Sequence, residues 1–120
     1  MTHNHDIVDA LRAPTRSLRD AIPETWHGFA EMHREAVSDG ALPSRFKELI
    51  ALSIATVDGC DGCIAYHARA AAARGAAREE VAEALGVALL MGGGPVSVHG
   101  PRALEAFDEF AAKQHIRDVG

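Results

Sequence analysis

Apolar residues recur every three or four positions along most of the chain, with charged and polar residues between them. This spacing is typical of amphipathic α-helices, and the sequence lacks the alternating β-branched runs that would indicate strands. We expect a loose tail over residues 1–5 and a first helix over about 6–12 that ends before Pro14. A second helix should begin at Pro23 and stop at Gly40. Its apolar face comprises Trp26, Phe29, Ala30, His33 and Val37.

The middle of the sequence predicts two helices joined by a tight turn. The first covers about 44–57, begins at a favourable N-cap serine and is apolar almost all round after its first turn. Such a helix belongs in the centre of a domain. Gly59 ends it, and the next helix opens at Cys60 or Asp61 and continues to Arg74.

Two further helices are expected over about 78–91 and about 96–114, separated by a glycine-rich break. Pro101 either begins the regular part of the last helix or kinks it. The pattern as a whole predicts a single all-α domain over residues 1–120, built from about five to six helices.

The composition limits the core that these helices can form. Hydrophobic residues make up 48% of the chain, but aromatic residues only 5%, and alanine is abundant. Alanine-lined helices pack closely, yet each contact buries little area, and burial is worth only about 25 cal/mol per Å². Association with other copies of the chain would bury more apolar area and so stabilise such a thin core. We therefore expect a homo-oligomer.

Charge and hydropathy argue against several classes of function. The net charge is −5 and no cluster of Lys and Arg stands out, so we expect no nucleic-acid partner. No apolar run approaches the roughly 20 residues of a membrane span, and the polar start lacks a signal-peptide pattern. We therefore expect a cytoplasmic protein without a membrane partner. In a reducing compartment, two cysteines three positions apart indicate redox or metal chemistry.

Cys60, Cys63 and His67 carry the candidate chemistry. Residues three and four apart are neighbours on a helix surface, so all three fall on one face at a helix start. Free N–H groups and the helix dipole stabilise a thiolate there, and a thiol pKa near 8.5 can fall to roughly 3.5–7.5. His67 can accept the proton of Cys63, and Cys60 is close enough to form a disulfide with it.

Other interpretations of these residues stay open at this point. Local sequence favours equally a proton-handling Glu48 and a first-turn glutamate that complements the helix dipole. Zinc is an alternative because two cysteines, His67 and Glu48 make four ligands, but a second Cys or His pair at matching spacing is lacking. We expect no bound metal. Residues 92–95 are expected to form a turn between helices rather than a phosphate loop, with His99 beyond it at the surface or an interface.

The combined motif Glu48-x11-Cys60-x2-Cys63-x3-His67 resembles the signature of the alkyl hydroperoxidase D (AhpD-like) proteins, within the carboxymuconolactone decarboxylase family. The resemblance covers roughly residues 42–110, and the combined motif is specific where Cys-x-x-Cys alone would not be.

That resemblance implies an all-α fold, homo-oligomers that are commonly trimers or hexamers, and thiol peroxidase or disulfide reductase activity with hydroperoxides as oxidants. It implies no bound cofactor, and an external dithiol such as a dihydrolipoyl-bearing protein as the electron donor. It also assigns Glu48 to a proton relay. True carboxymuconolactone decarboxylases lack the cysteine pair, which argues against decarboxylation. Three departures stand out: Gly62 lies where relatives often have an aromatic residue or histidine, His99 where they often have tyrosine, and Ala77 where they often have threonine.

The sequence thus predicts a thiol-dependent peroxidase whose catalytic residues are Cys63, Cys60, His67 and Glu48. Cys63, the neighbour of His67, attacks the peroxide and becomes a sulfenic acid. Cys60, expected to be the more exposed thiol, then closes the disulfide, and the dithiol enters at Cys60. Two alternatives are a dithiol–disulfide oxidoreductase with little peroxide turnover and a non-catalytic helical redox sensor.

Overall fold

The computed structural model describes the backbone of residues 2–119 and the side chains as far as residue 116. That part of the chain forms helices and no strand, which confirms the all-α prediction. The six helices are α1 (His3–Ala21), α2 (Pro23–Val37), α3 (Ser44–Asp58), α4 (Asp61–Ala73), α5 (Arg78–Gly92) and α6 (Gly94–Val119).

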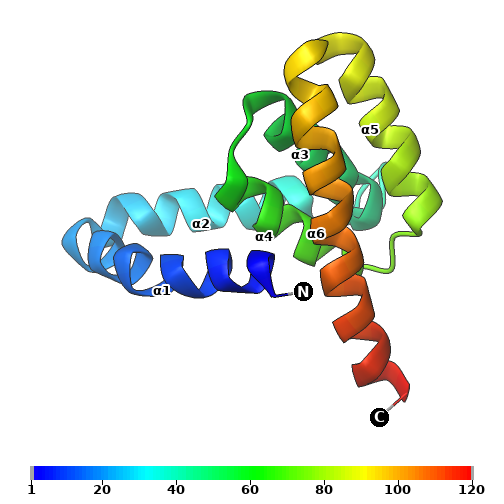
Figure 1. Cartoon of the computed structure of the whole chain (residues 1–120). Coiled ribbons are helices and arrows are strands. Elements are labelled where there is room, and N and C mark those ends of the chain that lie inside the picture. Colours follow the sequence, from blue (N-terminus) through cyan, green and yellow to red (C-terminus); the bar gives the residue numbers. More distant parts are fainter. Residues whose placement is uncertain (1, 120) are drawn as a thin grey trace.

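Helices α3 to α6 form the body of the molecule, and α4 packs against α3, α6 and α1 (Figure 1). The inner face of α4 is largely alanine, with Ala65, Ala68 and Ala71 fully buried. Ala103 and Ala106 of α6 belong to the same core cluster and are also fully buried. Small side chains let two helices approach closely, so the abundant alanine fixes the helix that carries the cysteines.

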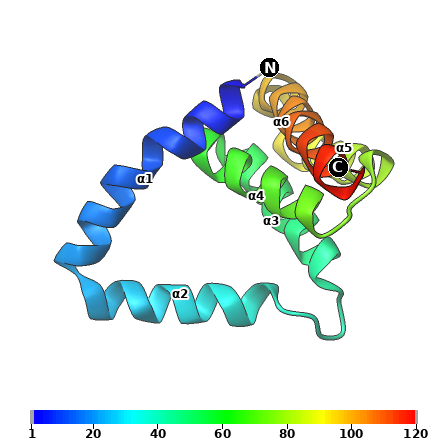
Figure 2. The same cartoon turned by 90° about the horizontal axis from the view of Figure 1, so that it is seen from below.

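Helices α1 and α2 extend away from the body and outline two sides of an open triangle, with α3 and α4 along the third (Figure 2). No side chain of α2 is buried. Phe29 and Met32 are 52% and 62% exposed. Of the apolar face predicted for α2, Trp26 and Val37 are half-buried and the other residues are exposed, so the single chain leaves most of that face uncovered.

A second apolar surface lies along α3 and α5 and surrounds an open groove of about 530 Å³. Its exposed side chains, which define the α3/α5 apolar face, are Ile50, Ile54, Val57, Val87 and Met91. Contiguous apolar surface of this kind is typical of interaction sites rather than of free surface.

The expected loose tail over residues 1–5 is wrong, because residues 3–5 form the first turn of α1. Thr2, at the N-cap position, makes no side-chain capping bond. Instead the carboxylate of Glu109 in α6 accepts the backbone N–H groups of Asn4 at 3.1 Å and His5 at 2.8 Å. A distant residue thus does the work of an N-cap, and local sequence holds no sign of it. Residue 1 lies outside the described part of the chain.

The expected end of the first helix before Pro14 is also wrong, since α1 continues to Ala21. Pro14 removes one intrahelical hydrogen bond, to the carbonyl of Ala10, but both residues are exposed and water can satisfy that carbonyl. Helix α6 likewise runs through Pro101 and extends beyond the predicted 96–114 at both ends.

Candidate active site

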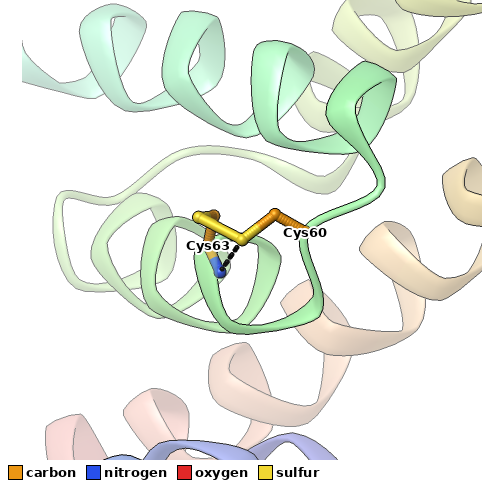
Figure 3. Close-up of a disulfide and its surroundings, with 2 residues drawn as sticks. All are labelled: Cys60 and Cys63. Carbon is orange, nitrogen blue, oxygen red and sulfur yellow. Dashed lines mark hydrogen bonds between the residues drawn. A yellow bond between two sulfur atoms is a disulfide. The ribbon is translucent and has the colours of Figure 1, made fainter.

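The two cysteines lie where α3 turns into α4. Gly59 ends α3 in the left-handed conformation with φ of 69°, which favours glycine. Cys60 follows as the N-cap of α4, and its Sγ accepts the N–H of Cys63 at 3.2 Å (Figure 3). The predicted location of the pair at a helix start is confirmed.

Cys60 and Cys63 form a disulfide, with their Cα atoms 5.2 Å apart. Their exposure reverses the sequence-based expectation, because Cys63 is exposed and Cys60 is half-buried. As the N-cap residue, Cys60 occupies the bend between two packed helices, whereas Cys63 lies one turn further along α4. Cys63 is therefore the sulfur that a molecule arriving from solvent meets first.

A carboxylate–imidazole pair joins α3 to α4 beside the disulfide. Oε1 of Glu48 and Nδ1 of His67 are 3.0 Å apart. The Glu48 side chain is only 2% exposed and that of His67 is 22% exposed. A buried carboxylate is costly unless it is hydrogen-bonded, so this contact accounts for a glutamate inside an apolar helix.

The contact also fixes how His67 can act. An ionised carboxylate only accepts hydrogen bonds, so an ionised Glu48 requires the form of His67 that carries a proton on Nδ1 and donates it. In the neutral ring, Nε2 is then the basic nitrogen. Because Cys63 lies four residues before His67 on the same helix, the two side chains are neighbours on one face of α4.

Helix α1 approaches the site at Gly62, the residue between the cysteines. A Cβ at Gly62 would lie 3.0 Å from Cδ1 of Leu11, closer than most real contacts. The absence of a side chain here, which the sequence left unexplained, therefore accommodates the packing of α1 over the start of α4.

His99 lies against the turn that precedes Cys60. A Cβ at Gly59 would lie 2.9 Å from Nε2 of His99, so the ring packs directly on the glycine. The residue is half-buried, and its Nδ1 is buried without a hydrogen-bond partner in the described part of the chain. The structure thus places His99 in packing contact with the turn rather than at the free surface.

One residue near the site was not predicted from the sequence. His33 of α2 stacks beside His67, with ring centroids 6.2 Å apart and planes inclined by 28°. The only signal was a histidine within the apolar stripe of α2. No local pattern could show that this histidine would meet a ring of α4.

Among the described residues, no three or more His, Cys, Asp and Glu side chains are grouped as metal ligands. None of the described helices is long and apolar enough to cross a membrane.

Residues 23–109 match the model of the carboxymuconolactone decarboxylase family. An uncharacterized protein of Cupriavidus necator is 38% identical over 96 residues, which span 80% of this chain and 85% of the relative. The range matched by the family model includes α2 as well as most of the body of the molecule.

Two solved structures have the same fold. A carboxymuconolactone decarboxylase family protein of Legionella pneumophila, in its apo form, is 38% identical, with a TM-score of 0.89 over 92% of this chain and 99% of that one. A family member from Thermotoga maritima, for which a role in the antioxidative response has been suggested, is 32% identical. Its TM-score is 0.78 over 92% of this chain and 93% of that one.

Proposed function

Because the chain belongs to the carboxymuconolactone decarboxylase family, we propose that it acts as a thiol-dependent peroxidase of the AhpD-like kind. The observation that carries this proposal is the hydrogen bond between Glu48 and His67, placed one helical turn from a Cys-x-x-Cys pair. A decarboxylase has no need of a disulfide at this position.

The first step is the reaction of the reduced protein with a hydroperoxide. The Cys63 thiolate attacks the outer oxygen of the peroxide, the O–O bond breaks, and the products are a sulfenic acid and an alcohol. His67 takes the thiol proton at Nε2, and this proton is available to the departing alkoxide. Glu48 stabilises the imidazolium that forms between these two events.

The second step closes the disulfide. Cys60 attacks the sulfenic sulfur of Cys63, the S–O bond breaks, and water leaves. The chain as described corresponds to this oxidised product.

The third step returns the protein to the dithiol. The sequence suggested that the reductant enters at Cys60, but the greater exposure of Cys63 favours attack there. The leaving thiolate is then Cys60, whose Sγ accepts the N–H of Cys63 at the positive end of α4. One thiol of an external dithiol, such as a dihydrolipoyl-bearing protein, forms a mixed disulfide with Cys63. Its second thiol then displaces Cys63, and the donor leaves as a disulfide.

Trapping of the sulfenic acid tests both the activity and the assignment of the two cysteines. In Cys60→Ser treated with one equivalent of cumene hydroperoxide, dimedone should label Cys63, because no second thiol consumes the sulfenic acid. If dimedone instead labels Cys60 in Cys63→Ser, the roles are reversed. If neither variant is labelled, the chain is a disulfide oxidoreductase or a redox sensor rather than a peroxidase.

The two uncovered apolar surfaces support a homo-oligomer, as the family resemblance implies. The apolar side of α2 and the α3/α5 apolar face are both exposed in one chain. Burial of both against further copies would stabilise the thin alanine-rich core, in the trimer or hexamer that the resemblance implies.

A further inference from the structure

The contact between His33 and His67 brings α2 to the thiol site. The ring centroids are 6.2 Å apart, within the range of about 4.5–7 Å at which paired rings interact. Helix α2 has no buried side chain of its own. A ring contact with the site is therefore unusual on a helix that otherwise contributes nothing to the core.

The surroundings of His33 on its own helix do not explain the residue. The positions three and four residues away, which are its neighbours on the helix surface, are Phe29, Ala30, Ala36 and Val37. None of these side chains is charged or able to form a hydrogen bond. The aromatic partner of His33 on another element is the His67 ring on α4.

The hydrogen bond to Glu48 leaves part of the orientation of His67 undefined. It holds Nδ1 of the ring at 3.0 Å from Oε1, but a single hydrogen bond permits the ring to tilt about that contact. Tilting moves Nε2 relative to the neighbouring Cys63 sulfur. A second ring beside the His67 face restricts this motion.

We propose that His33 is a positioning residue of the thiol site, whose ring holds the imidazole of His67 in the orientation that serves Cys63. This inference rests on the proposed function, in which His67 is the base. The ring acts through its shape and position. A flat hydrocarbon ring should therefore replace it in large part, whereas alanine should not.

The test compares His33→Ala, His33→Phe and a matched control, His27→Ala, which removes another exposed histidine of α2. Each protein is reduced with dithiothreitol and desalted. Two rates are then measured: loss of thiols with one equivalent of cumene hydroperoxide, and alkylation by iodoacetamide, which needs no peroxidase activity. The melting temperature of each variant serves as the measure of folding.

His33→Ala should slow both reactions by at least about five-fold. This loss is part of the rate enhancement of roughly 10²–10⁴ that a well-placed base contributes. His33→Phe should restore most of that loss, and His27→Ala should behave as wild type, with similar melting temperatures throughout. The inference is overturned if His33→Ala reacts at the wild-type rate in both assays, or if His33→Phe is as slow as His33→Ala.

The two assays separate this inference from the proposed function. If wild-type thiols react with hydroperoxide no faster than a free thiol, the peroxidase proposal fails. A slower alkylation of His33→Ala, restored in His33→Phe, would still support the positioning role. Normal peroxide turnover with unchanged rates in His33→Ala would overturn the positioning role alone.

Discussion

Glu48 lies within an apolar helix, where a carboxylate is costly, and the hydrogen bond to His67 offsets that cost. At the residue scale this pair links structure to chemistry, because the same contact satisfies the buried oxygen and sets the proton position on the imidazole. A change at Glu48 should therefore affect reactivity more than folding.

Glu48→Gln should slow thiol oxidation by hydroperoxide about 10- to 100-fold, because an amide accepts the Nδ1 proton but stabilises an imidazolium poorly. The free energy of unfolding should fall by less than about 2 kcal/mol, since the hydrogen bond is kept. Stopped-flow rates and urea denaturation measure the two effects. Glu105→Gln, at an exposed glutamate of α6, is the control. A wild-type oxidation rate in Glu48→Gln would remove Glu48 from the mechanism.

Some of these residues could be predicted from the sequence and others could not, for a physical reason. Cys60, Cys63 and His67 lie within one short helix segment, where spacing alone decides which side chains are neighbours. The contact of Glu48 with His67 depends on how α3 packs on α4, so local sequence left two interpretations open. His33 and Leu11 reach the site from helices whose direction no local pattern specifies.

Among the helix boundaries too, some could be predicted from local sequence and others, such as the start of α1, could not. Glycines at Gly59 and Gly75, with φ of 69° and 82°, mark the ends of α3 and α4, and these boundaries were predicted well. The start of α1 depends instead on Glu109, far away in sequence. Burial raises the pKa of Glu109. The hydrogen bonds from Asn4 and His5 lower it by a larger amount in total, so the pKa lies below its ordinary value of 4.5.

This lowered pKa predicts how stability depends on pH. The Glu109 carboxylate stabilises the fold fully above pH 4.5, and this contribution is lost as the pH falls through the lower folded value. Glu109→Gln should therefore be about 1–3 kcal/mol less stable than wild type at neutral pH.

Melting temperatures between pH 7 and pH 3 check this prediction, with Glu105→Gln again as the exposed control. The difference in melting temperature between wild type and Glu109→Gln should become smaller below pH 4.5. A gap that stays constant down to pH 3 would show that the charge of Glu109 does not hold the start of α1.

At the scale of the whole molecule, a single chain leaves two apolar surfaces largely exposed. Its body is held by closely packed alanines, while α2 and the α3/α5 apolar face leave large side chains in solvent. The sequence indicated this balance through low aromatic and high alanine content. It could not show which faces remain uncovered, because that depends on the angle at which α1 and α2 leave the body.

Sedimentation velocity at micromolar concentration tests the expected homo-oligomer. Wild type should sediment as more than one chain, and Ile54→Lys should shift it to a single chain. Ile54 is 57% exposed in the α3/α5 apolar face. A lysine there should therefore weaken association between chains while leaving the fold of each chain intact. Ala112→Lys, at an exposed position of α6, should sediment as wild type. A wild-type protein that is only monomeric would contradict this prediction.

A thiol titration tests most directly whether the protein is a peroxidase with His67 as its base. It is made on reduced protein before and after one equivalent of a hydroperoxide, for wild type and His67→Ala. We expect rapid loss of two thiols in wild type, and a loss slowed at least about 100-fold in His67→Ala, because a positioned base contributes a factor of roughly 10²–10⁴ to the rate. Equally slow loss in both proteins would contradict a peroxidase with His67 as its base, and would favour disulfide exchange or redox sensing instead.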